Sequence, residues 1–222
     1  MYIYIVNIKP AAMKDIQRIM YKPYKYDTAY FYMQKCMQQY CTDYKDYGTL
    51  KSLIYYAMCN PESQIINNHK ALCFYGATGS GKTLHMKGLS LFMTLPQTER
   101  NGFEYGVEFI HNGAIKPFSF NIYHVRQIFQ DYAEGGFDRI KNILVEPVIC
   151  IDDVGTEDVA NNYGNKVDLF AHIIETRYDK NNVTHLTTNL NPQQLRERYG
   201  ERVYSRLRET TQFLNFGTED RR

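Results

Sequence analysis

The strongest chemical signal lies in residues 73–86, "CFYGATGSGKTLHM", where a glycine-rich loop joins an apolar run to a helix-like segment. The spacing G-x-x-x-x-G-K-[ST] is met by Gly76, Gly81, Lys82 and Thr83. Glycines let the backbone N–H groups point inward, and the helix N-terminus adds positive potential. Lys82 can then reach the outer phosphates, and the Thr83 hydroxyl can bind Mg²⁺. The predicted phosphate-binding residues are Gly76, Ala77, Thr78, Gly79, Ser80, Gly81, Lys82, Thr83 and Leu84.

A second signal is the apolar run "VICIDD" at 148–153, which ends in two carboxylates. Such a strand would end beside the glycine loop, so Asp152 is predicted to hold Mg²⁺. Asp153 would then face the attacking water as a candidate general base. The alternative is that the acidic pair only caps a following helix.

Two further matches are typical of GTPases: "DDVG" fits D-x-x-G, and "NKVD" at 165–168 fits N-K-x-D. In GTPases the second element follows a buried strand of its own. Here it follows "DVANNYG", which is polar and turn-like. We therefore interpret Asn165 as the cap of a helix and favour ATP over GTP as the nucleotide.

Polar and basic residues follow the next predicted strand, "VTHLTTNL". It ends in Thr187, Thr188 and Asn189, at the sheet edge where sites of open α/β proteins lie. The alternative for Asn189 is a helix cap before Pro192. In the arginine-rich run that follows, we expect Arg202 and Arg206 to share an exposed helix face.

The elements needed to position these residues alternate between strands and helices, which indicates an α/β fold with a parallel sheet and helices on both faces. A hairpin-containing insertion is expected at 97–117. Helices are predicted at 11–21, 28–41, 49–59, 82–94, from 122 to Gly135-Gly136, at 166–178 and as a pair at 192–209. Strands are predicted at 71–76, 118–120, 148–152, 183–188 and 211–216.

Composition limits the class of protein further. The chain has 222 residues, a net charge of +2 and no apolar run long enough to span a membrane or act as a secretory signal, so a cytoplasmic location is expected. Five cysteines lack zinc-site spacing and are predicted to be reduced, mostly buried thiols. The first 60 residues hold eight Lys or Arg, four Asp and twelve of the twenty tyrosines. These tyrosines either stack nucleic-acid bases or pack on the main domain.

The motifs "GATGSGKT", "VICIDDVGTE", "TTNL" and "YGERVYSRL" together resemble the AAA+ ATPases of the DnaC/IstB type. These are bacterial and phage helicase loaders, transposition helpers and relatives of the DnaA clade. The resemblance covers roughly residues 40–222. It implies a three-layer P-loop NTPase domain at 39–222, preceded by a Tyr- and Lys-rich helical extension at 1–38. Because the chain ends just after the last strand, no helical lid is expected.

The resemblance also implies roles for individual residues. Asn189 matches the first sensor, Arg206 the arginine finger that reaches a neighbouring subunit, and Arg221 a second-sensor arginine. Arg202 is the alternative candidate for the arginine finger. Where many AAA+ proteins have Glu as the base, this chain has Asp153, and Glu157 is the alternative base.

The sequence thus predicts an ATPase that uses ATP and Mg²⁺ and forms a homo-oligomer on ATP and DNA. The expected partners are single-stranded DNA and a replicative helicase, which the protein would load. Two alternatives remain: a transposition helper with a transposase as its partner, and an ATP-gated binding module with little hydrolysis.

Overall fold

The structure is a computed structural model, and it describes residues 3–5, 17–21, 26–58, 70–94, 107–111, 114–157, 161–162, 165–166 and 168–217. The chain divides into two units. The N-terminal unit comprises Met1–His69 and Leu84–Phe120, and the phosphate-loop unit comprises Lys70–Thr83 and Asn121–Arg222.

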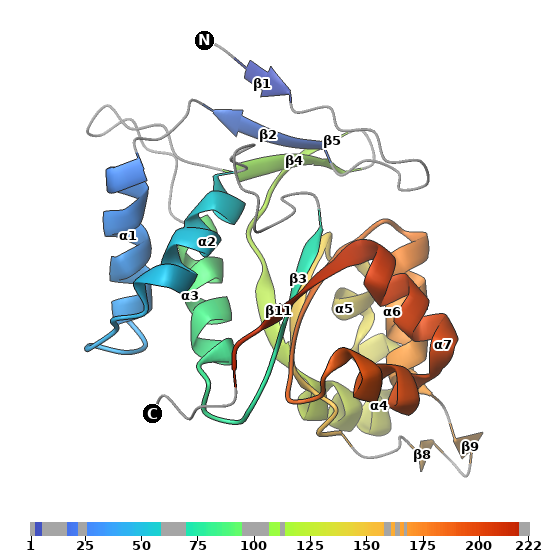
Figure 1. Ribbon diagram of the computed structural model, residues 1–222. Coiled ribbons are helices and arrows are strands. Elements are labelled where there is room, and N and C mark those ends of the chain that lie inside the picture. Colours follow the sequence, from blue (N-terminus) through green and yellow to red (C-terminus); the bar gives the residue numbers. More distant parts are fainter. Residues whose placement is uncertain are drawn as a thin grey trace. The chain divides into compact units, whose positions relative to one another are not determined.

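The phosphate-loop unit contains a five-stranded sheet in which every neighbouring pair is parallel (Figure 1). The strand order is β11-β3-β10-β7-β6. The register pairs Tyr75 with Thr188, Thr188 with Val154 and Asp152 with His124, so the carboxyl ends of four strands meet at one edge. The strands are β3 (Ala71–Tyr75), β6 (Asn121–His124), β7 (Val148–Val154), β10 (Val183–Thr188) and β11 (Thr211–Asn215).

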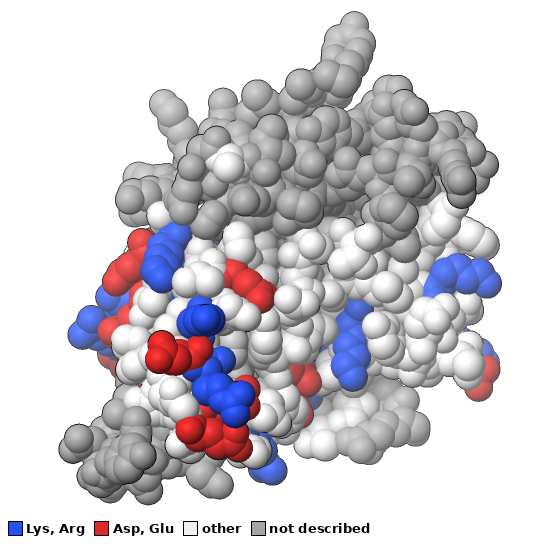
Figure 2. Space-filling model, turned by 180° about the vertical axis from the view of Figure 1, so that it is seen from behind, with Lys and Arg blue, Asp and Glu red and all other residues white. Residues whose placement is uncertain are grey.

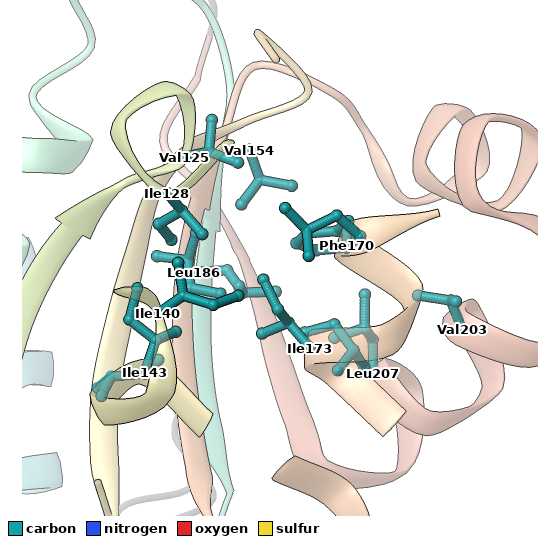
Figure 3. Packing of buried hydrophobic residues seen from close by; sticks show 14 of the residues in the cluster. Val125, Ile128, Ile140, Ile143, Val154, Phe170, Ile173, Leu186, Val203 and Leu207 are labelled. Atoms are coloured by element: carbon teal, nitrogen blue, oxygen red, sulfur yellow. The ribbon is translucent and has the colours of Figure 1, made fainter. Parts of the chain in front are cut away.

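Four helices of the same unit pack on this sheet through a hydrophobic cluster (Figure 3). They are α4 (Val125–Arg139), α5 (Lys141–Val145), α6 (Leu169–Asp179) and α7 (Pro192–Thr210). Their side chains meet Val154 of β7 and Leu186 of β10, both almost fully buried. Full burial of each such side chain contributes roughly 1.5–3 kcal/mol, so the cluster holds the helices against the sheet.

Helix ends in this unit are set by capping side chains. Asp168 caps α6 by accepting from the Ala171 N–H at 3.0 Å. Asn165 lies in the two-residue strand β9 (Asn165–Lys166), which pairs with β8 (Asn161–Asn162), so the prediction that Asn165 caps this helix is wrong. Sequence could not separate two cap-forming residues three positions apart, because both have short oxygen-bearing side chains.

Helix α7 is a pair of helices, as predicted, because Gly200 interrupts it with φ +80° and ψ 166°. Its N-cap is Asn191, which accepts from the Gln194 N–H, while the Gln194 side chain accepts from the Asn191 N–H. This capping box excludes the alternative in which Asn189 serves as the cap.

The N-terminal unit contains α1 (Tyr26–Gln38), α2 (Tyr47–Ala57) and most of α3 (Lys82–Thr94). Helices α1 and α3 approach closely at Gly88, where a Cβ atom would overlap Met37 Sδ. A four-stranded antiparallel sheet, ordered β1-β2-β4-β5, completes the unit. Its strands are β1 (Ile3–Ile5), β2 (Gln17–Tyr21), β4 (Val107–His111) and β5 (Ala114–Pro117).

The observed strands agree with the predicted hairpin and differ from the predictions for 11–21 and 118–120. The hairpin expected within 97–117 is confirmed by β4 and β5. The helix predicted at 11–21 is wrong for 17–21, because β2 pairs with β4, a partner far away in sequence that no local pattern reports. Residues 118–120 form no strand; β6 begins at Asn121, and the following helix begins at Val125 rather than at residue 122.

The structure bears on two predictions made from composition, the absence of a membrane-spanning segment and the buried cysteine thiols. Within the described ranges, no helix has the length and apolar character needed to cross a membrane. The thiols of Cys36, Cys73 and Cys150 are buried, and burial raises the pKa of each, so these cysteines remain protonated. Cys59 lies outside the described residues.

Candidate active site

The glycine-rich loop connects β3 to α3 with a backbone that requires glycine at three positions. Gly76, Gly79 and Gly81 have φ values of +144°, +83° and +91°. Residues with a Cβ atom rarely adopt these values, so the glycine spacing in the sequence reflects a conformational need. Residues 76–83 form the loop and the start of α3, and Leu84 continues the helix.

The segment after β11 fixes the start of this loop. The Ala77 N–H donates to Gly217 O at 3.1 Å, and the Phe216 N–H donates to Tyr75 O at 2.8 Å. A Cβ atom on Gly76 would lie 2.6 Å from Gly217 O, which leaves no room for a side chain. Sequence reasoning did not anticipate this contact. Arg221, the predicted second sensor, lies outside the described residues.

Lys82 places its ammonium group inside the loop. Its side chain donates to Gly76 O at 2.9 Å, Ala77 O at 2.8 Å and Ser80 Oγ at 3.4 Å. Lys82 is 5% exposed, so this positive charge is largely shielded from water. A phosphate oxygen that takes the place of one of these acceptors would gain a charge-assisted hydrogen bond in a site of low dielectric constant.

Thr83 and Asp152 bring together the two oxygen ligands predicted for Mg²⁺. The Thr83 hydroxyl donates to Asp152 Oδ1 at 2.8 Å, and Asp152 lies at the end of β7 with 6% exposure. Mg²⁺ prefers oxygen ligands and commonly binds through one or two protein groups together with water and phosphate oxygens. The donor set of this pair therefore fits Mg²⁺.

The Thr187 hydroxyl connects the two carboxylate residues. It donates to Asp152 Oδ1 at 2.5 Å and accepts from the Asp153 N–H at 2.9 Å. A threonine hydroxyl has a single proton, so these two bonds fix its orientation. Thr187 is fully buried, and it thereby sets the position of the Mg²⁺ ligand and of the backbone of the next residue.

Asp153 has an uncommon backbone conformation, with φ +57°. Its Oδ2 lies 3.3 Å from His124 Nε2 at the end of the neighbouring strand β6. His124 Nδ1 accepts from the Arg126 N–H at 3.2 Å, so the ring proton is on Nε2 and faces the carboxylate. The Asp153 side chain is 37% exposed, which leaves it accessible to a water molecule.

The role of His124 was missed at the level of sequence. The only local signal was its position as the last residue of the short run "NIYH", and its contact with Asp153 depends on the pairing of β6 with β7.

The carboxylate of Glu157, the alternative base, is buried and hydrogen-bonded to other groups of the chain. It is 5% exposed and accepts from the Gly155 N–H at 2.8 Å and from the Tyr199 hydroxyl. Arg198 Nη2 lies 3.5 Å from the same carboxylate. Since the Asp153 carboxylate is partly exposed and both oxygens of the Glu157 carboxylate already accept hydrogen bonds, the geometry favours Asp153 as the base.

Asn189 and the arginines complete the predicted set. Asn189 is exposed and directly follows β10, between the ends of β3 and β7 in the sheet order. Arg202 is exposed and pairs with Glu175 at 2.7 Å. Arg206 is half-buried rather than fully exposed, because its guanidinium stacks 5.0 Å from the centre of the Tyr178 ring. The two arginines thus differ in exposure, contrary to the prediction.

A glycine loop with an inward lysine and a Thr83–Asp152 pair at the carboxyl edge of a parallel sheet defines the P-loop NTPase fold. The predicted α/β fold class is therefore confirmed.

Several solved structures share this fold. DnaI aligns with a TM-score of 0.56 and 21% identity over 85% of this chain and 93% of its own. The DnaC helicase loader aligns with a TM-score of 0.52 and 22% identity over 76% of this chain and 88% of its own. A candidate primosome component from Streptococcus pyogenes serotype M3 aligns with a TM-score of 0.52 and 17% identity over 79% of this chain and 81% of its own. No protein-family profile and no curated protein sequence matches. In fold, the chain is of the DnaC type, as its motifs indicated.

Replacement of Lys82 by Ala should weaken ATP binding and leave the fold intact. The variant loses a charge-assisted contact worth about 1.5–3 kcal/mol, which corresponds to roughly a ten- to 150-fold rise in the Kd for ATP. Isothermal titration calorimetry with ATP and Mg²⁺ measures this change. Lys141→Ala, at an exposed position on α5, is the matched control and should bind ATP like the parent chain. Parental affinity in the Lys82 variant would rule out this loop as the nucleotide site.

Proposed function

We propose that the chain binds ATP with Mg²⁺, hydrolyses it, and acts in DNA replication by loading a replicative helicase on single-stranded DNA. The observation that carries the catalytic part is the Thr187 hydroxyl, which holds Asp152 against Thr83 and also positions the backbone of Asp153. A fixed metal ligand next to an accessible carboxylate suits phosphoryl transfer to water.

Each side chain of the site has a defined role. Lys82 binds the outer phosphates, and Thr83 and Asp152 hold Mg²⁺, which neutralises phosphate charge when bound. Asp153 orients the attacking water and accepts its proton, while the His124 Nε2–H keeps the carboxylate in place. Asn189, exposed beyond the neighbouring strand, contacts the γ-phosphate or the water.

The helicase-loading part of the proposal is supported by the DnaC-type fold and by the surface of the N-terminal unit. Phe31 and Tyr40 are 52% and 48% exposed, with Lys35 5.6 Å and Lys87 5.9 Å from the centres of these rings. Exposed rings beside lysines suit the stacking of bases and the binding of phosphates in single-stranded DNA. On the described surface in the view of Figure 2, Lys and Arg are interspersed with Asp and Glu, and no large area has one sign.

A transposition helper would share every motif of this site. The discriminating observation is which protein the chain captures at a defined stoichiometry, a replicative helicase or a transposase.

Replacement of Asp153 by Asn should keep ATP affinity within about twofold and lower kcat by at least a hundredfold, because it removes a base and spares the metal ligand. Phosphate release with ATP and Mg²⁺, with and without a single-stranded oligonucleotide, measures the change. The parent should turn over faster with the oligonucleotide. A parent without turnover in both conditions would instead support the ATP-gated binding module.

We further propose that the chain works as a homo-oligomer in which Arg206 acts on the ATP of a neighbouring subunit. The second half of α7 carries Arg206, and Val203 and Leu207 anchor that segment in the core. Arg206 Nε is buried and, among the described residues, has no hydrogen-bond partner. Stacking on Tyr178 holds the guanidinium by one face, and Nη1 makes only a long hydrogen bond of 3.5 Å to Arg202 O, which a phosphate could replace.

The Arg206→Ala variant should bind ATP like the parent but hydrolyse it poorly, since an arginine supplied in trans can be worth roughly 10³ to 10⁵ in rate. Mixing it with Lys82→Ala chains should restore part of the activity, because one variant supplies the loop and the other the arginine. Parental turnover in Arg206→Ala without any effect of mixing would contradict the shared site. If Arg202→Ala behaves as predicted here for Arg206, the role belongs to Arg202.

A further inference from the structure

The loop that follows β7 connects the candidate base to two helices. Asp153 O accepts from the Thr156 hydroxyl at 2.8 Å and from the Thr156 N–H at 3.2 Å, which closes a tight turn. On one side, Arg126 Nε of α4 donates to Thr156 O at 2.8 Å. Because Asp153 has a positive φ, its position depends on such contacts: a residue in this conformation persists only where its surroundings hold it.

On the other side, Glu157 ties the loop to α7. One carboxylate oxygen, Oε2, accepts from the Gly155 N–H at 2.8 Å. The other, Oε1, accepts from the Tyr199 hydroxyl and lies 3.5 Å from Arg198 Nη2. Arg198 also donates to Glu157 O at 2.6 Å. Glu157 thus accepts hydrogen bonds at both carboxylate oxygens and at its backbone carbonyl. Each donor belongs either to the base loop, residues 153–157, or to α7.

The hydrogen bonds of Tyr199 and Arg198 to Glu157 make the position of the 153–157 loop depend on the position of α7. Tyr199 packs on Phe170 of α6, with ring centres 4.3 Å apart, and burial and the Glu157 hydrogen bond raise its pKa, so the hydroxyl stays a donor. Gly200 follows directly, with a backbone conformation that breaks the helix. A Cβ atom on Gly200 would meet no heavy atom within 4 Å, so the break does not result from close packing. The half of α7 that contacts Glu157 therefore ends at the break, and the half that carries Arg206 begins after it.

We propose that Glu157 is a positioning residue: its carboxylate holds the loop of Asp153 to the Arg198–Tyr199 end of α7 and makes turnover depend on the position of that helix. The proposal rests on the proposed ATPase function. It reassigns Glu157 from alternative base to the link between the base loop and the helix that carries the candidate arginine finger.

The test compares Glu157→Gln and Glu157→Ala with Asp153→Asn in the 222-residue chain. A glutamine keeps an oxygen that accepts from the Gly155 N–H or the Tyr199 hydroxyl, whereas alanine removes all side-chain bonds. Glu157→Ala should lower kcat by roughly ten- to a hundredfold at unchanged KM for ATP, the range expected when a reacting group is misplaced. Glu157→Gln should recover most of that loss. Glu201→Gln, at an exposed ion pair with Arg196 on the same helix, is the matched control and should match the parent.

Two kinetic outcomes would overturn the proposal. If Glu157→Gln is as inactive as Asp153→Asn, Glu157 is the base, because an amide cannot accept the proton. If Glu157→Ala keeps the parental kcat and only melts at a lower temperature, the contact serves stability alone.

Hydrogen exchange of the 153–157 segment gives a readout that does not need turnover. Exchange should be faster in Glu157→Ala and in Tyr199→Phe, and parental in Glu201→Gln. Parental exchange in both Glu157→Ala and Tyr199→Phe would also overturn the proposal. A parent chain that hydrolyses no ATP would contradict the proposed function, and the exchange result would then decide separately whether Glu157 holds the loop.

Discussion

The arrangement of the site depends on the single proton of the Thr187 hydroxyl. Thr187 donates to Asp152 and accepts from the backbone of Asp153, so one buried side chain separates two adjacent carboxylates into different environments. Asp152 is held against Thr83 and is almost fully buried, while Asp153 turns outward toward His124. Identical residue types can carry different chemistry when their surroundings differ in this way.

The neighbouring threonine stabilises the sheet at the same point. Thr188, the next residue, donates to Val154 O at 2.6 Å and accepts from the Leu190 N–H at 3.0 Å, so β10 and β7 are joined beyond their regular ladder. The register between these strands shifts at this point, between Leu186 and Thr188. Two adjacent threonines therefore stabilise an irregular strand end, and the irregularity gives Asp153 its uncommon conformation.

The structure brings together those predicted site residues that lie in continuous local motifs. The loop at 76–83 and the pair Asp152–Asp153 follow from spacing, because each motif is continuous along the chain. Apolar runs and glycine and proline signals also predicted most helices and strands of the phosphate-loop unit. They did not predict α5 or the short strands β8 and β9, and they placed a strand at 118–120 instead of β6 at 121–124.

It failed where a contact depends on the pairing of distant segments. Strand β2 exists because of β4, and His124 meets Asp153 only because β6 lies beside β7. The occupied state of Glu157 depends on α7, which follows it by a whole helix and strand. In each case the residue type was visible in the sequence, but its partner was not.

A pair of variants tests directly whether the Thr187 hydroxyl organises the two carboxylates. Thr187→Val removes the hydroxyl at nearly constant volume, and Thr187→Ser keeps it. Steady-state phosphate release should fall at least tenfold in the valine variant, which leaves the Asp153 N–H without its acceptor, and stay near the parental value in the serine variant. Parental turnover in a folded Thr187→Val chain, at the same Mg²⁺ requirement, would show that the Thr187 hydroxyl does not organise the two carboxylates.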